Sequence, residues 1–233
     1  MTPGLKNFLT ATDLDYLSSA RAEISEMNAD DIIEIMNILK QWSDVQKISN
    51  LLMHSDLIPA KDRLNYVLKG LNEKKNKYLV LAASIGLYQI DIEVLNETEQ
   101  SNIVERLIEI VEQENDMLAE RASTFLADKL IFLQKNYATH VVGLLNHSSE
   151  LVKHNMLVAL IHLVGLENIR KFFDTALESA KLSKEGRLYA EGQLRTIKGL
   201  GEDNKVAGAQ IDLGWLSKTL LSYVPNLKEW PLE

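Results

Sequence analysis

Residues Ser149 to Leu163 read SELVKHNMLVALIHL, and the spacing of their apolar side chains decides the fold. Met156, Ala159 and Leu160 follow Val152 by four, seven and eight positions, and this spacing places all four on one face of an α-helix. The same spacing recurs on both sides of this stretch. The matching sets are Leu79, Ala83, Gly86 and Leu87; Leu118, Ala122, Phe125 and Leu126; and, as a weaker copy, Gly186, Ala190, Gln193 and Leu194. Successive copies are therefore offset by 39, 34 and 34 residues.

A second amphipathic stretch separates each copy from the next. Its apolar residues are Ile103, Leu107, Ile110 and Val111 in the first interval, Val141, Val142, Leu144 and Leu145 in the second, and Ile169, Phe172, Phe173 and Leu177 in the third. Repeats of about 34 to 47 residues with two helices each are typical of helical solenoids, because one hairpin is too thin to bury its own apolar face. We therefore predict an all-α protein, a short α-solenoid of helical hairpins with N- and C-terminal capping helices. An irregular helical bundle is the alternative that this pattern leaves open.

The stretch from Ser149 to Leu163 also resembles the first-helix pattern of the HEAT-repeat family, in which a valine and a basic residue precede small or apolar residues and then Ala-Leu and Leu. NDMLAERASTFLADK, from Asn115 to Lys129, is a looser copy. The resemblance covers about half of the chain, residues 77–198. It departs from the family pattern because the turn proline is missing and Lys153 is the main basic residue after a valine position. Such a resemblance implies a fold and says little about function.

Helix start signals divide the chain further. Thr12, Asn28, Ser43, Asn115 and Ser149 each offer a side-chain oxygen to the free amides of a first turn, and an acidic residue follows that suits the helix dipole. Sustained alternation of the β type is hard to find. The predicted helices span residues 13–27, 29–41, 44–54, 60–71, 77–89, 99–112, 116–133, 137–146, 150–164, 167–182, 184–198 and 213–223.

Three regions follow from these helices. Residues 1–76 form an N-terminal helical cap in which the repeat register is lost, and residues 77–198 hold the HEAT-like repeats. Residues 199–233 form a glycine-rich loop, beginning with a helix stop at Gly199, and a C-terminal capping helix. Trp215 and Trp230 are expected to pack over the last repeat.

Composition places the chain among ordinary globular proteins, with 46% apolar and 25% charged residues. The absence of cysteine excludes disulfides, thiolate metal ligands and a cysteine nucleophile. No export signal is expected at the start of the chain, and the longest apolar stretches are shorter than the roughly 20 residues that cross a bilayer. We expect a cytoplasmic protein that does not enter membranes.

Catalytic and cofactor motifs are not supported by the residues. The five histidines form no His-Glu-x-x-His motif, and none precedes a glutamate as in the repeated His-Glu pairs of the HEAT-like deoxyhypusine hydroxylases. Gly199-Leu200-Gly201 follows a predicted helix and lacks a third phosphate-binding glycine. HEAT-like DNA glycosylases use a basic groove, whereas this chain has a net charge of −8. We therefore expect no metal and no cofactor, do not favour an enzyme, and regard nucleic acid as an unlikely ligand.

Charge is concentrated in one segment. From Asp91 to Lys129 there are eleven acidic and three basic residues, a surplus of eight negative charges, as large as the net charge of the whole chain. A solvated helix face that aids solubility explains this equally well. The functional hypothesis is a non-enzymatic interaction module or scaffold that binds a basic protein or peptide through Glu105, Glu109, Glu112, His140 and Asp174. The alternative is a nucleic-acid-binding or enzymatic HEAT-like protein with its site in a concave groove.

Overall fold

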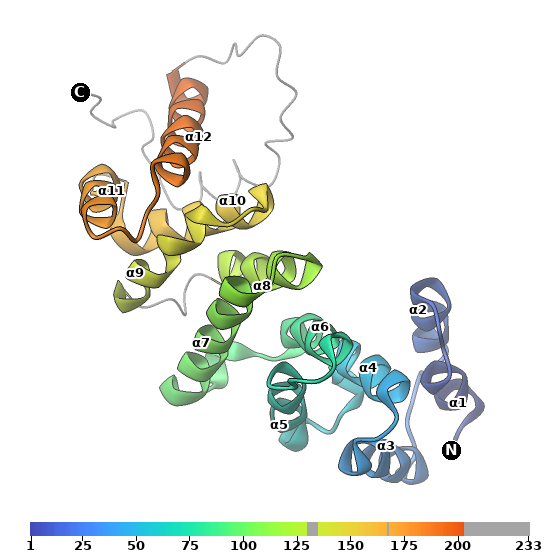
Figure 1. Ribbon diagram of the computed structural model, residues 1–233. Coiled ribbons are helices and arrows are strands. Elements are labelled where there is room, and N and C mark those ends of the chain that lie inside the picture. The colour runs from blue at the N-terminus through green and yellow to red at the C-terminus, as the bar shows by residue number, and fades with distance from the viewer. Residues whose placement is uncertain (130–134, 167, 203–233) are drawn as a thin grey trace. The chain divides into compact units, whose positions relative to one another are not determined.

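The computed structural model describes residues 1–129, 135–166 and 168–202, and every regular element in these ranges is a helix (Figure 1). No strand occurs in them. The all-α prediction is thus confirmed. The chain divides into two compact units, Met1–Arg106 and Leu107–Glu233, and each is described by itself. The boundaries predicted at residues 76 and 198 mark where the repeats begin and end, and they stay predictions.

The first unit consists of short helices joined by tight turns. Its elements are α1 (Pro3–Leu9), α2 (Leu14–Ala22), α3 (Ala29–Gln41), α4 (Val45–Met53), η1 (Ser55–Leu57), α5 (Ala60–Leu71), α6 (Lys77–Gly86), η2 (Leu87–Gln89), η3 (Ile92–Val94) and the start of α7 (Glu97–Gln113). The second unit contains the end of α7, then α8 (Met117–Asp128), η5 (Lys135–Tyr137), α9 (Ala138–Val141), η6 (Gly143–Asn146), α10 (Glu150–Val164), α11 (Ile169–Glu178) and α12 (Lys184–Glu202).

The bounds of three helices, α3, α5 and α10, agree with the prediction. The helix α1 was missed, although Thr2 caps it and Pro3 occupies its first position. The predicted helix over 137–146 is wrong as one element, because it is split into η5, α9 and η6. The predicted stop at Gly199 is also wrong, since α12 continues to Glu202. The helix predicted over 213–223 lies outside the described residues.

The predicted helix caps are correct at two helix starts and lie one residue too early at three. Asn28 and Asp31 form a capping box at α3, and the Ser149 hydroxyl accepts from the Val152 amide at α10. At the other three starts the acidic residue is itself the cap, and not the Thr, Ser or Asn before it. These caps are Asp13, Asp44 and Asp116. A carboxylate serves both as acceptor for the free amides and as negative charge at the dipole.

The repeated positions form the cores of α6 with η2, α8, α10 and α12. Of the sixteen side chains or glycines in the four copies, Gln193 alone is partly exposed and the others are buried. Leu87, Leu126 and Leu160, predicted as equivalent core residues, have exposures of 0%, 2% and 0%. The spacing in the sequence therefore identified the buried faces correctly.

In the first unit, α6 packs against both α4 and α5 (Figure 1). The Ser55 hydroxyl donates to the Gly86 carbonyl oxygen at 2.9 Å, and the Gln89 side-chain amide donates to the Met53 carbonyl oxygen at 3.2 Å. These bonds join the ends of α4 and α6, so both helices terminate at the same edge and run parallel. The helix α5 lies between α4 and α6 in the chain and returns it in the opposite direction, so α5 and α6 form an antiparallel hairpin.

In the second unit, α10 packs against α8 and also contacts α11 and α12. Three side-chain hydrogen bonds link the α8 region to the α10 region, from Ser148 to Asn115, Ser149 to Glu120 and Asn155 to Ser123. Their partners are 33, 29 and 32 residues apart, and such a nearly constant separation means that α8 and α10 run parallel. Lys153 lies 4.7 Å from the ring centre of Tyr189 and links α10 to α12.

Among the helices formed by described residues, none is both long enough and apolar enough to cross a membrane.

Candidate interaction surface

The helix α7 separates an apolar face from an acidic one. Ile103, Leu107, Ile110 and Val111 are at most 2% exposed, as the spacing predicted. Glu105, Glu109 and Glu112 are all exposed. The helix begins two residues earlier than predicted, because Asn96 and Glu99 cap each other reciprocally at 3.0 Å. The sequence thus predicted which side of α7 faces solvent.

The charges on α7 act against the stability of the helix itself. Glu105 and Glu109 are one turn apart, and like charges at that spacing destabilise an isolated helix by about 0.2–0.5 kcal/mol. Glu112 adds a negative charge to the last turn, where the helix dipole is already negative and no basic residue follows. Gln113 donates to Glu109 at 3.2 Å and offsets part of this cost. Burial of the apolar face therefore holds the helix.

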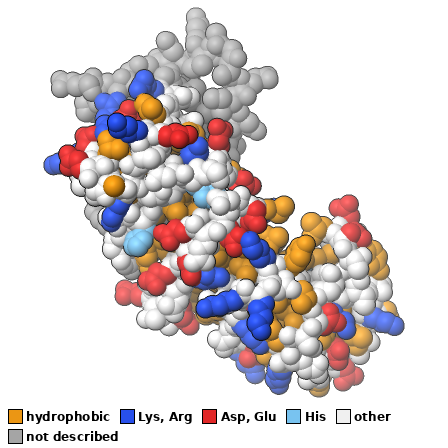
Figure 2. Space-filling model, viewed as in Figure 1, with side chains coloured by type: hydrophobic (Ala, Val, Ile, Leu, Met, Phe, Trp, Pro, Cys, Tyr) orange, Lys and Arg blue, Asp and Glu red, His pale blue; other side chains and the backbone are white. Residues whose placement is uncertain are grey.

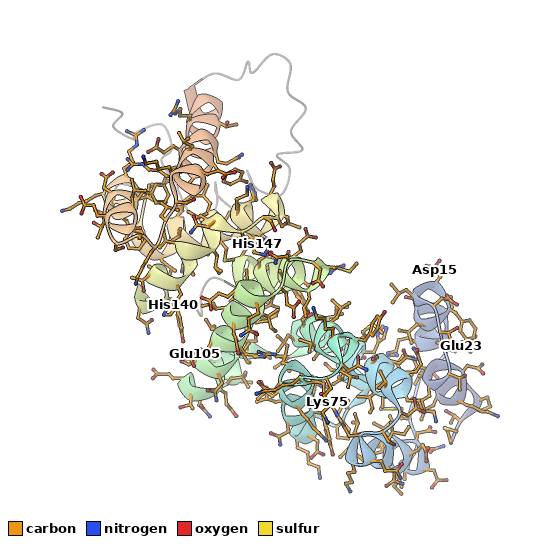
Figure 3. The ribbon with its side chains drawn as sticks, viewed as in Figure 1. Asp15, Glu23, Lys75, Glu105, His140 and His147 are labelled. Carbon is orange, nitrogen blue, oxygen red and sulfur yellow. The ribbon has the colours of Figure 1, made fainter. Side chains whose placement is uncertain are left out.

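His140 lies next to the acidic face. Figure 3 labels His140, on α9. The Nδ1 atom of His140 is 3.9 Å from a carboxylate oxygen of Glu112, and both side chains are exposed. These two predicted site residues, 28 positions apart in sequence, are brought together within the second unit. A basic side chain of a partner that approaches Glu112 therefore meets the His140 ring beside it.

Asp174 has a structural partner instead. Its carboxylate lies 2.6 Å from a guanidinium nitrogen of Arg187, so it ties α11 to α12. Arg187 also binds Glu191 at 2.8 Å, and these two acids, Glu191 foremost, raise the pKa of Arg187 above its ordinary value. Because Arg187 neutralises Asp174, this residue contributes less negative charge to a surface than the three glutamates of α7.

Three other histidines, His54, His147 and His154, serve packing and turns. In His147, Nδ1 accepts from the Ser149 amide at 3.0 Å, so Nε2 carries the proton that is donated to the Glu114 carbonyl oxygen at 2.8 Å. Burial lowers the pKa of His54, which packs edge-on against Phe8, and burial likewise lowers the pKa of His154. In the part of the chain that the structure describes, no group of three or more His, Asp or Glu residues could hold a metal ion.

A second charged surface escaped the sequence analysis. We call it the basic corner: Lys69, Lys74, Lys75 and Lys77, with Trp42, Tyr66 and Tyr78 beside them. The stretch from Lys69 to Lys77 contains four lysines and one acid. Lys75 is labelled in Figure 3, and Figure 2 shows basic side chains gathered over the same part of the first unit. The four lysines are visible in the sequence, but they were missed because the net charge of the whole chain is negative.

Trp42 is fixed at the centre of the basic corner. It ends α3 in the left-handed conformation, with φ of 50°. Its ring stacks with Tyr66 at 6.3 Å between centres, and the Lys69 ammonium lies 4.0 Å from a ring centre. The indole N–H donates to Glu73 at 3.3 Å. Left-handed backbone costs a bulky residue about 1–2 kcal/mol, and these contacts offset that cost.

Comparison with known proteins gives no relative: no family model, no curated protein and no solved structure matches this chain.

Proposed function

We propose that this chain is a non-enzymatic interaction module, a short α-solenoid of HEAT-like hairpins that binds a basic protein through the acidic face of α7. The parallel packing of α4 on α6, and of α8 on α10, supports the solenoid, because stacked hairpins align their first helices in parallel. The N-terminal cap over 1–76 and the C-terminal cover over 199–233 belong to this proposal.

The observation that carries the function is the contrast between the two sides of α7. Leu107 and Val111 are fully buried at 0% exposure, whereas Glu105, Glu109 and Glu112 are exposed and destabilise the helix that carries them. Solubility alone is served equally well by glutamates anywhere on the surface. A row on one helix produces a local negative potential that attracts a basic partner and raises its association rate.

Glu112 and His140 define the end of this surface that is best formed. Both side chains are exposed, so a lysine or arginine of a partner can approach the Glu112 carboxylate beside the His140 ring. Asp174 contributes little to the proposed surface, because Arg187 already binds it. Recognition therefore rests mainly on the three glutamates of α7.

Affinity capture with matched variants tests this proposal. The full chain, the variant with Glu105, Glu109 and Glu112 all changed to Lys, and a control with Glu23, Glu26 and Glu178 changed to Lys are each used to capture proteins from native lysate. All six glutamates are exposed, although Glu109 accepts from Gln113 and Glu112 lies 3.9 Å from His140, and both variants change the net charge equally. We expect basic proteins that bind the wild type and the control but not the α7 variant. If both variants lose the same proteins, net charge is responsible and the acidic face is not a site.

A further inference from the structure

The basic corner is a surface of opposite charge in an acidic protein. Of the exposed side chains in it, Lys69, Lys74 and Lys75 make no ion pair within 4.0 Å among the described residues. The one acid of the stretch, Glu73, is occupied: the amide of Lys75 donates to it at 2.9 Å and Trp42 donates to its other oxygen. These bonds, that of Lys75 foremost, lower the pKa of Glu73, which stays ionised and acts as an internal acceptor.

Two further cationic side chains belong to elements beside the lysine stretch. The Arg106 guanidinium of α7 donates to the Leu71 carbonyl oxygen at 2.8 Å, at the end of α5 where the lysine stretch begins. Lys77 stands at the first position of α6. Since Lys69 already rests on the Trp42 ring, its aliphatic chain and ammonium are held in place, and binding costs less side-chain entropy than for a free lysine.

Tyr78 provides an apolar contact beside the charges. Its side chain is 74% exposed, although the next residue, Leu79, is buried in the core. No packing role within the described chain explains a tyrosine at this position. Tyrosine is enriched at protein interfaces, because one ring supplies large contact area at low entropic cost, and the neighbouring lysines add positive charge to this contact.

From these observations we infer that Lys69, Lys74, Lys75 and Tyr78 of the basic corner form a docking site for an acidic peptide segment of a partner protein. The lysines pair with carboxylates, and Tyr78 contacts an apolar side chain between them. This site shares no residue with the acidic face of α7 and does not depend on the function proposed for that face.

A single-stranded nucleic acid fits the corner less well. Such strands stack successive bases on several exposed aromatic rings, and here Tyr78 alone is well exposed while Trp42 and Tyr66 are half-buried. The basic stretch is also short, and the net charge of −8 disfavours a long polyanion. A peptide with a few carboxylates places its charge only where the lysines are.

Peptide titration with the full chain tests the assignment. The probes are a short fluorescent peptide of repeated Glu-Glu-Leu, the same peptide with glutamine for glutamate, and an oligothymidylate of matched length. We expect binding of the glutamate peptide, weakened about tenfold or more in Lys74→Glu/Lys75→Glu and weakened at high salt. The control Lys181→Glu/Lys184→Glu changes net charge equally at two exposed lysines and leaves binding within about twofold.

Tyr78→Ser separates docking from general attraction, because it leaves the charge unchanged and Tyr78 contributes nothing to the core. We expect it to weaken the glutamate peptide several-fold with unchanged helicity. The inference is overturned if the glutamine peptide binds equally well, if both charge variants weaken binding alike, or if Tyr78→Ser has no effect. Tighter binding of the oligothymidylate than of the peptide, lost in Lys74→Glu/Lys75→Glu, would assign the corner to nucleic acid instead.

Discussion

The backbone of Gly86 in α6 lies directly against the main-chain carbonyl oxygen of Leu52 in α4, so close that a β-carbon on Gly86 would collide with that oxygen. The Ser55 hydroxyl bonds the Gly86 carbonyl at the same place. A glycine occupies this position because the two parallel helices touch here through their backbones. Glycine is required for space, and its φ of −63° is ordinary helical backbone.

Gly86→Ala is accordingly expected to destabilise the protein, by about 1–3 kcal/mol or more, because α4 and α6 must separate. Gly192→Ala is the matched control, since a β-carbon at Gly192 would meet nothing within 4 Å. That change should stabilise α12 by up to about 1 kcal/mol, the difference in helix propensity between the two residues. Chemical denaturation of both variants measures the effects, and equal stabilities would show that the close approach at Gly86 is unimportant.

Leu126→Ala removes a core side chain of α8 that is 2% exposed. We expect a loss of about 2–5 kcal/mol from the cavity that remains. Leu188→Ala, at a position 67% exposed, should change stability by no more than about 0.5 kcal/mol. Thermal melts followed by circular dichroism compare the two. A small loss for Leu126→Ala would mean that the repeated positions are not core positions.

Asp31 links α1 to α3 in the first unit. Burial alone would raise the pKa of its carboxyl, but hydrogen bonds from the Thr2 and Asn28 amides outweigh it and lower the pKa below the ordinary 3.8. The resulting stabilisation is therefore present above about pH 4 and is lost as the pH falls through the depressed pKa. Asp31→Asn should cost about 1–3 kcal/mol at neutral pH.

The pH dependence distinguishes this role of Asp31 from simple packing. The stability difference between wild type and Asp31→Asn should shrink below pH 3.8, the value at which the unfolded carboxyl takes up its proton. Asp30→Asn, at an exposed acid in the same turn, is the control and should have a small effect throughout. A constant difference between pH 7 and pH 3 for Asp31→Asn would contradict the assignment.

Local patterns in the sequence predicted much of the fold. The repeated spacing identified the buried faces of α8 and α10, because periodicity along one helix is a property of neighbouring residues. The caps at Asp13, Asp44 and Asp116 were each predicted one residue too early. Two adjacent side chains can each cap a helix, and the backbone conformation decides between them.

Contacts between distant segments were not predictable in this way. Nothing in the sequence shows that Arg187 binds Asp174, or that the buried Asn155 donates to Ser123 and Thr124. Such pairs depend on how one hairpin packs on the next. The basic corner is a different case. Its four lysines lie close together in the sequence and could have been counted, but the contact of Trp42 with this stretch depends on how the end of α3 packs.

The most direct test of the account is the association rate of the partner identified by affinity capture, measured by stopped-flow fluorescence at low and high salt. With Glu105, Glu109 and Glu112 changed to Lys, we expect unchanged helicity and an association rate reduced about tenfold or more at low salt, with a smaller difference at high salt. The control with Glu23, Glu26 and Glu178 changed to Lys should associate at nearly the wild-type rate. An α7 variant that binds at the wild-type rate would show that the acidic face of α7 is only a solvated surface.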